Sequence, residues 1–482
     1  LELEHIIYNP DGSIAQTQKQ SIQIKGGELY SFRTETSPIL SPRLWAPEAP
    51  HLYRVESILR DKKTKAILDH SNHHTGFRWF SFDGKTGFSL NGKPYKLRGI
   101  CRHQDQKPIG VALTDEMHRR DMKLMKKEEE LKPVLERTLS LANRLEKVLK
   151  EEDSTRVSTM AFHGSNSYNE VGLGNITDIV GWNLYQGWYG GNLTGFERFL
   201  TEQHKKYPSH PMIVSEYGAG SDKRLHSLQP HAYDFSIEYQ QKYLEHYLPI
   251  LEETPYICGG THWNFIDFSS ALRDESMPRI NNKGLIYSDR SPKDVYYYYK
   301  AAWRQDIPVL HIASRDWTHR SGVQHGKAPV PLPVKVYTNL PEVELFIDGK
   351  SLGKQKTENY TVTFQVPFSR KKHFISAQAE NKESDQSISM IEDALHINFT
   401  PIPANLNETN LRNLELAVNV GSNCFYTSDE SQLTWLPDQP YTESSWGYIG
   451  GESKNSQTQV ENTHDGPLFQ TLRNEIEGYC FD

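Results

Sequence analysis

The sequence is short of the features that mark several classes of protein. Its four cysteines are scattered and form no CxxC pair, which indicates neither a zinc site nor a disulfide framework; they are Cys101, Cys258, Cys424 and Cys480. No run of 18 apolar residues is present, so no membrane span is expected. The net charge of −7 argues against nucleic acid as a partner. No metal site and no cofactor are predicted.

The start of the chain carries little information on cellular location. No signal peptide is visible, and the chain begins Leu-Glu-Leu-Glu without an initiator Met, which predicts a start inside a domain.

Aromatic residues are abundant, with 25 Tyr, 19 Phe and 9 Trp. Tyr and Trp offer flat apolar faces with a polar group attached, which suits sugar rings, although β-sandwiches are also rich in aromatic residues. The length of 482 residues allows three or four domains.

Both ends of the chain show strand patterns. Ser21 to Lys25 alternates polar and apolar residues, and a further strand is expected at His51 to Ser57, so residues 1–86 are predicted to form an immunoglobulin-like β-sandwich. Residues 305–392 show the same alternation, with a turn at Asp348-Gly349, and predict a second such sandwich. Residues 393–482 are rich in Asn, Ser, Thr and Gly and predict a last β-sandwich.

The central part, residues 87–304, alternates strand and helix patterns after a hairpin turn at Asn91-Gly92. Five short apolar strands are expected, at 95–100, 157–162, 179–185, 212–217 and 259–265. A (β/α)8 TIM barrel needs eight strands. The predicted fold is therefore a multidomain protein with a TIM barrel, incomplete in this sequence, flanked by β-sandwiches.

An unusually long helical pattern lies inside this barrel, from Thr114 to Glu152, where typical helices have 8–20 residues. It is interrupted near Lys126 and Lys127 and again at Pro133, which fits the first turn of a second helix. Because two helices in succession break the β/α alternation, we infer that a segment is missing near residue 127.

Glu216 ends the short apolar run that begins at Met212. A carboxylate at the carboxyl end of a barrel strand faces the mouth where barrel enzymes carry out their chemistry. The alternative is a glutamate that lies in solvent at the end of a strand.

Other predicted strand ends also carry polar and aromatic side chains. These candidate sugar-binding residues are Arg102 and His103 after the first strand, Asn183, Tyr185 and Tyr189 after the third, and Trp263 at the fifth. Taken singly, each is as well explained by a core or surface role. Together they offer groups that bind hydroxyls and stack against rings.

Several stretches, taken in order, resemble glycoside hydrolase family 2, the family of β-galactosidases, β-glucuronidases and β-mannosidases. They are Leu44-Trp-Ala-Pro-Glu-Ala-Pro-His-Leu-Tyr53, Thr75-Gly-Phe-Arg78, Asn91-Gly-Lys-Pro-Tyr-Lys-Leu-Arg-Gly99 with Arg102-His103, Ser215-Glu-Tyr-Gly218, Trp263-Asn-Phe-Ile-Asp-Phe268 and Asn281-Asn-Lys-Gly284. The resemblance covers roughly residues 40–305. A shorter stretch, Ser445-Trp-Gly-Tyr-Ile-Gly-Gly451, resembles a malectin-like carbohydrate-binding domain.

The family resemblance implies a retaining double displacement, in which one carboxylate attacks the anomeric carbon and a second serves as acid and base. Glu216 matches the family nucleophile, and His103, Asn183, Tyr185, Tyr189 and Trp263 match positions that line the sugar subsite. The family acid/base is a Glu in an Asn-Glu pair after the fourth barrel strand. Asn169-Glu170 follows a later strand, so no acid/base residue is assigned.

The sugar is less well indicated. Asn281 and Lys283 match the Asn-x-Lys motif with which β-glucuronidases hold a sugar carboxylate. The same motif occurs in relatives that act on neutral sugars. It can also be a purely structural turn. The sequence favours an exo-β-galactosidase, with a β-glucuronidase second and a non-catalytic carbohydrate-binding remnant as a third interpretation. An oligo- or polysaccharide substrate and a periplasmic or extracellular location are expected, and a homo-oligomer stays open.

Overall fold

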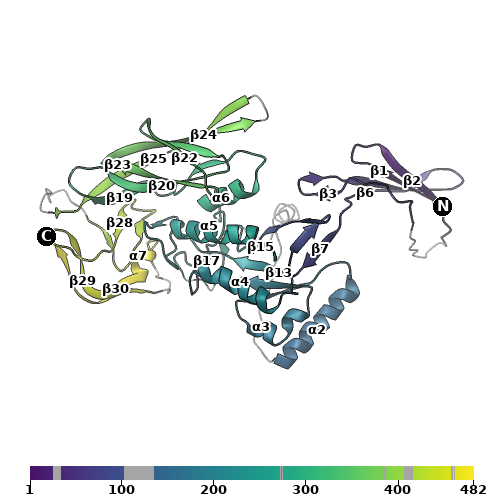
Figure 1. Ribbon diagram of the computed structural model, residues 1–482, viewed down its shortest axis with the longest axis horizontal. Helices are drawn as coiled ribbons and strands as arrows, with labels where there is room; N and C mark the ends of the chain where they lie inside the picture. Colours follow the sequence, from purple (N-terminus) through teal and green to yellow (C-terminus); the bar gives the residue numbers. More distant parts are fainter. Residues whose placement is uncertain are drawn as a thin grey trace. The chain divides into compact units, whose positions relative to one another are not determined.

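The computed structural model describes most of the chain (Figure 1). The described residues are 1–24, 34–101, 135–271, 273, 275–383, 387–406, 416–456, 460 and 462–482. They form two compact units, Leu1–Lys96 and Leu97–Asp482. None of the described helices combines the length and the apolar character that crossing a membrane requires.

The first unit is built from antiparallel strands. Its main sheet has the order β2-β1-β5-β6, with β1 at Glu2–Tyr8, β2 at Ile14–Ser21, β5 at Tyr53–Arg60 and β6 at Ile67–Thr75. Shorter strands follow as β3 (Trp45–Ala46), β4 (Ala49–Pro50), β7 (Phe80–Asp83), β8 (Gly87–Leu90) and β9 (Lys93–Pro94). The predicted turn between β8 and β9 is confirmed, since Asn91 and Gly92 both have positive φ, 52° and 78°.

The strand predicted at Ser21 to Lys25 is wrong over Ile22 to Ile24, which lie outside any strand. Ser21 is the last residue of the observed strand β2 and pairs with Glu2 of β1. Ile22 still exchanges backbone hydrogen bonds with Leu1, and Lys25 lies outside the described residues.

The second unit contains the predicted parallel sheet. Its strands are β10 (Leu97–Ile100), β11 (Thr159–His163), β12 (Ile179–Asn183), β13 (Met212–Tyr217) and β15 (Ile257–His262), in the spatial order β10-β15-β13-β12-β11. The first strand thus pairs in parallel with the last, as barrel closure requires. All five expected strands are present, and the sheet is an arc of a TIM barrel in which the described residues supply five of eight strands.

Helices cover the outside of this arc (Figure 1). They are α2 (Leu135–Glu152), α3 (Ser167–Glu170), the 3-10 turn η1 (Leu173–Asn175), α4 (Thr194–Lys206), α5 (Ile237–Glu253) and α6 (Asp294–Trp303). Helix α5 begins where Ser236 Oγ accepts a hydrogen bond from Tyr239 N at 3.1 Å. The missing segment inferred near residue 127 lies outside the described residues, as does the start of the long helical pattern.

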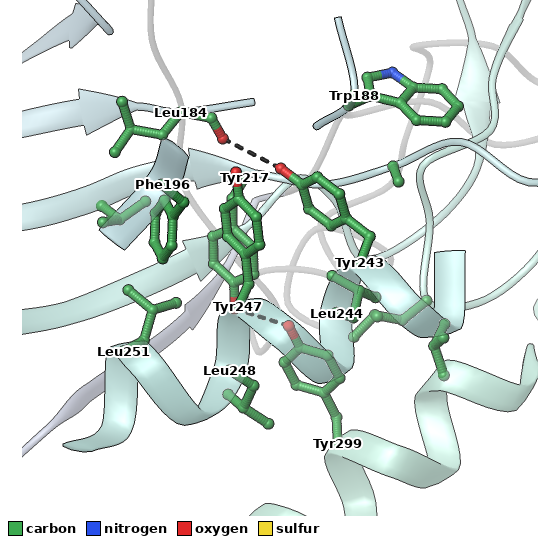
Figure 2. Close-up of a cluster of buried hydrophobic side chains, with 14 of the residues drawn as sticks. Leu184, Trp188, Phe196, Tyr217, Tyr243, Leu244, Tyr247, Leu248, Leu251 and Tyr299 are labelled. Carbon is green, nitrogen blue, oxygen red and sulfur yellow. Dashed lines mark hydrogen bonds between the residues drawn. The ribbon is translucent and has the colours of Figure 1, made fainter. Parts of the chain in front are cut away.

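Between the strands and the helices lies a core rich in tyrosine (Figure 2). Tyr217, at the end of β13, packs 5.6 Å from the Tyr247 ring of α5, and its hydroxyl lies 2.8 Å from that of Tyr299 in α6. Because successive side chains of a strand point to opposite faces, anchoring Tyr217 in the helical layer directs its neighbour Glu216 to the interior of the barrel.

Beyond the barrel, two β-rich regions follow in the same unit. The strands of the first are β18 (Leu310–Ile312), β19 (His319–Gln324), β20 (Val330–Thr338), β21 (Glu342–Ile347), β22 (Lys350–Lys356), β23 (Thr361–Phe368), β24 (Lys371–Glu383) and β25 (Ser387–Pro403). They form two sheets, β18-β20-β23 and β19-β25-β24-β21-β22, around an apolar core. The Asp348-Gly349 turn between β21 and β22 is confirmed, with φ of 52° and 78°.

The last region contains β26 (Val418–Asn419), β27 (Phe425–Thr427), β28 (Thr434–Pro437), β29 (Trp446–Asn455), α7 (Pro467–Gln470) and β30 (Thr471–Phe481). A strand of the barrel segment, β14 (Leu225–His226), joins its sheet by pairing with β27. This region is therefore tied to the barrel by main-chain hydrogen bonds. Its malectin-like character and the domain boundaries drawn from the sequence stay predictions.

Candidate active site

Glu216 lies at the carboxyl end of β13 and is 7% exposed. The hydroxyl of Tyr185 donates a hydrogen bond to Glu216 Oε2 at 2.8 Å. Asn183, the last residue of β12, is the register partner of Glu216, and its Oδ1 accepts a 2.8 Å hydrogen bond from Ser215 Oγ. Glu216 is therefore a buried carboxylate held in one orientation at the barrel mouth.

Tyr185 also belongs to a group of aromatic side chains at the site, the aromatic wall, which contains Tyr189, Trp263 and Phe268 as well. Its ring lies 5.1 Å from the ring of Tyr189, and it packs against a small cluster of Trp263, Phe268 and Cys101. Burial, followed by the nearby charge of Glu216, raises the pKa of Tyr185 well above its ordinary value. The phenol therefore stays protonated and serves only as a donor to the carboxylate.

Lys283 is the second buried charge at this site. Its side chain has no solvent exposure, and its Nζ lies 5.0 Å from the centre of the Tyr189 ring and 5.6 Å from that of Trp188. Among the described residues, Nζ has no hydrogen-bond partner. The ammonium lies over two aromatic faces, and no carboxylate in the described ranges forms an ion pair with it.

The surroundings of Lys283 disfavour its charge. Burial and then the positive charge of Arg273 lower the pKa of Lys283 to about 7, although Glu275, Asp267 and Glu216 act in the opposite direction. A negatively charged ligand beside Nζ would favour the protonated form.

Asn281 sits in the short strand β17 (Ile280–Asn281), which pairs with β16 (Phe268–Ser269). It is 3% exposed, and its Oδ1 accepts a long hydrogen bond of 3.4 Å from the backbone N of Lys283. The Asn-x-Lys motif thus forms a local turn that is also buried beside the site.

Arg273 and Glu275 belong to the same neighbourhood but were not predicted from the sequence. Arg273 Nη1 donates to the hydroxyl of Tyr189 at 3.0 Å and to Glu275 Oε1 at 2.7 Å. Tyr233 donates a further 2.8 Å hydrogen bond to the same Glu275 oxygen. Arg273 and Glu275 lie in a polar stretch after β16 that shows no strand or helix periodicity, so no sequence signal pointed to them.

The structure brings six of the predicted residues into one chain of contacts, through Tyr185 and Tyr189; they are Glu216, Asn183, Tyr185, Tyr189, Trp263 and Lys283. Asn281 joins through its contact with Lys283. Arg102 and His103 lie outside the described residues.

The two Asn-Glu pairs that the structure describes, Asn169-Glu170 and Asn474-Glu475, do not belong to this site. Glu170 is exposed in α3, where its Oε1 lies 4.0 Å from Lys206 Nζ. Glu475 lies in β30 of the last β-rich region, and Asn407-Glu408 lies outside the described residues.

In the described part of the chain, no three His, Cys, Asp or Glu side chains come close enough together to hold a metal ion. The site contains a buried carboxylate with a hydrogen-bond donor, an aromatic wall, and a buried cation that has no hydrogen-bond partner among the described residues. These groups suit a ring-shaped polar ligand that carries a negative charge.

Comparisons with known proteins agree with this architecture. A family model described as "Glycosyl hydrolases family 2, TIM barrel domain" matches residues 140–307, and one described as "Glycosyl hydrolases family 2" matches residues 1–78. A third model, "Domain of unknown function (DUF4982)", matches residues 330–372.

Three relatives of known name are similar over much of the chain. The sequence of Bacteroides uniformis beta-glucuronidase, for which a crystal structure exists, is 64% identical to this chain. The match covers 100% of this chain and 67% of that chain, and the two structures superpose with a TM-score of 0.90. A structure of Bacteroides uniformis beta-glucuronidase 2 covalently bound to cyclophellitol-6-carboxylate aziridine is 63% identical, with the same coverage and a TM-score of 0.90.

The beta-glucuronidase of Bacteroides fragilis is 30% identical over 414 residues, which are 68% of this chain and 58% of the relative. The chain thus spans somewhat more than half the length of that curated relative. The matching family models, the barrel topology and the extent of these similarities show that the chain belongs to glycoside hydrolase family 2.

Proposed function

We propose that this protein is a retaining β-glucuronidase, with Glu216 as the nucleophile and Lys283 as the ligand of the sugar carboxylate. The observation that carries the proposal is the fully buried Nζ of Lys283, which has no hydrogen-bond partner among the described residues. Leaving a buried ammonium without a counter-ion is costly, and a glucuronide would supply the missing anion. A galactoside has a neutral hydroxymethyl group at the same position and would leave the charge unpaired.

The names of the relatives support the same choice. Proteins similar at 64% and at 30% identity are called beta-glucuronidases, whereas the sequence alone favoured a β-galactosidase. The relative that was solved covalently bound to cyclophellitol-6-carboxylate aziridine carries a ligand with a carboxylate, and a covalent adduct fits a mechanism with an enzyme nucleophile.

In the proposed reaction, Glu216 attacks the anomeric carbon and forms a glycosyl-enzyme ester, which water then hydrolyses with retention of configuration. The Tyr185 hydroxyl, 2.8 Å from Glu216 Oε2, orients the carboxylate before the attack. Tyr189 and Trp188 provide apolar surface next to Lys283. The second carboxyl group that the double displacement needs is not assigned to any described residue.

The test compares hydrolysis of 4-nitrophenyl β-glucuronide and 4-nitrophenyl β-galactoside by the wild-type protein and by Glu216→Gln. We expect turnover of the glucuronide and a loss of about 10⁴-fold or more in kcat for the variant, the scale seen when a covalent nucleophile is removed. If the protein hydrolysed the galactoside faster, it would instead be a β-galactosidase, as the sequence alone favoured. Absence of turnover with either substrate would favour the non-catalytic remnant.

A further inference from the structure

The backbone on both sides of Lys283 is fixed by two buried side chains from other parts of the barrel region. Lys293 Nζ donates a 2.9 Å hydrogen bond to the carbonyl oxygen of Asn282. The backbone N of Gly284 donates a 2.7 Å hydrogen bond to Asp267 Oδ1. The residues before and after Lys283 are thus each held by a charged group.

The carbonyl group of Lys283 itself is also held. It accepts hydrogen bonds from His262 Nε2 at 3.0 Å and from the backbone N of Asn264 at 3.3 Å. Burial lowers the pKa of His262 to about 3, so this imidazole is neutral near pH 7 and its proton on Nε2 can be donated to the carbonyl. The main chain therefore leaves Lys283 little freedom to change direction.

Lys293 and Asp267 are bonded to each other as well. Lys293 Nζ lies 2.9 Å from Asp267 Oδ1, and both side chains are only 1% exposed. The third hydrogen bond of Lys293 reaches Ser221 Oγ at 3.2 Å. All three donors of this ammonium are used within the protein, so it is not available to bind a substrate.

Glycine 284 allows this close approach. A Cβ atom at Gly284 would lie 2.5 Å from both the backbone N and the Oδ1 of Asp267. Any side chain there would push the segment away from the carboxylate.

We propose that the Asp267–Lys293 pair is a positioning pair that aims the Lys283 ammonium at the substrate carboxylate and thereby sets the preference for acidic sugars. The inference rests on the proposed function. Neither residue touches the substrate; both act through the main chain of Asn282 and Gly284.

The test measures KM and kcat for 4-nitrophenyl β-glucuronide in the double variant Asp267→Asn/Lys293→Met, which removes both charges so that neither is left unpaired in the interior. We expect KM to rise at least about tenfold, with kcat changed by less than about threefold, since the nucleophile and its Tyr185 donor are untouched. Adding Lys283→Met to the double variant should raise KM little further, because residues that act as one unit are not additive.

The matched control is Asp438→Asn/Arg473→Met, which removes a buried ion pair of 2.9 Å in the last β-rich region and should leave KM unchanged. If the double variant does not fold, Gly284→Ala provides the second test, because it displaces the segment without removing a charge, and it should raise KM in the same way. An unchanged KM in a folded variant, or a fall in kcat alone, would overturn the inference. Lack of glucuronide turnover by the wild type would instead refute the proposed function.

Discussion

Two buried lysines in the same part of the barrel have opposite surroundings. Around Lys293, an aspartate, a serine hydroxyl and a carbonyl oxygen accept all three hydrogen bonds of the ammonium. Around Lys283, two aromatic rings lie below the ammonium, and no described group accepts a hydrogen bond from it. Equal burial thus goes with two different roles.

The difference lies in where the counter-ion comes from. Burial lowers the pKa of both lysines, which shows that both charges are disfavoured by the loss of water. The fold supplies Asp267 to offset this for Lys293, whereas no described group forms a hydrogen bond with Lys283 Nζ, and we propose that a bound anion supplies the offset there. A charged group that the protein itself leaves unpaired is a good indicator of a ligand site.

The largest expected effect is a difference in protein stability between variants of the two lysines. Lys293→Met leaves the Asp267 carboxylate buried without its partner and should lower the free energy of unfolding by about 3–5 kcal/mol. Lys283→Met removes an unpaired charge and should leave the free energy of unfolding unchanged or raise it. Guanidinium denaturation of both variants measures this, and equal destabilisation would show that Lys283 has a structural partner after all.

The next effect concerns the substrate. Lys283→Met should raise KM for 4-nitrophenyl β-glucuronide by about 10–100-fold, the range for loss of a hydrogen bond to a charged group. Steady-state kinetics at pH 6 test this, with Lys335→Met as the control, because Lys335 of β20 pairs with Glu245 of α5 and has no contact with the site residues named above. A KM equal to that of the wild type would remove Lys283 from substrate binding.

A smaller effect should appear in the pH profile. Since the pKa of Lys283 is lowered to about 7, the free enzyme loses the ammonium above that pH, and kcat/KM for the glucuronide should fall by roughly tenfold per pH unit. The charged groups that face Lys283 are Arg273, Glu275, Asp267 and Glu216, and their balance sets where the fall begins. A kcat/KM that stays level from pH 7 to pH 9 would contradict a depressed pKa.

A last effect is on stability as a function of pH. The ordinary pKa of a lysine is 10.5, so between about pH 7 and 10.5 the unfolded chain binds the proton that folded Lys283 has lost. The free energy of unfolding should therefore rise with pH across this window on account of Lys283. The difference between wild type and Lys283→Met, followed by denaturation from pH 6 to pH 10, should show this rise, and a constant difference would argue against it.

Much of the framework could be predicted from the sequence. The five barrel strands are short apolar runs, and the turns at Asn91-Gly92 and Asp348-Gly349 follow from local backbone preferences. The position of Glu216 follows from its place at the end of such a run. The strand Ile14–Ser21 shows the limit of local patterns, because it is mostly polar and no apolar alternation marked it.

The choice of sugar could not be predicted, because it depends on tertiary contacts. The sequence of the motif Asn281-x-Lys283 is the same whether the motif forms a structural turn or binds a carboxylate. Only the fold shows that Lys283 is buried with no hydrogen-bond partner in the described part of the chain, while Lys293 is paired with Asp267 from a separate segment. Arg273 and Glu275 were missed for the same reason, since they approach Tyr189 through a stretch with no regular pattern.

The most direct test of the account is calorimetric binding of D-glucuronate and D-glucose at pH 6 to the wild-type protein and to Lys283→Met. The account predicts that the wild type binds glucuronate at least about tenfold more tightly than glucose, and that the variant binds the two sugars alike. A variant that keeps the preference for glucuronate would contradict the claim that Lys283 recognises the sugar carboxylate.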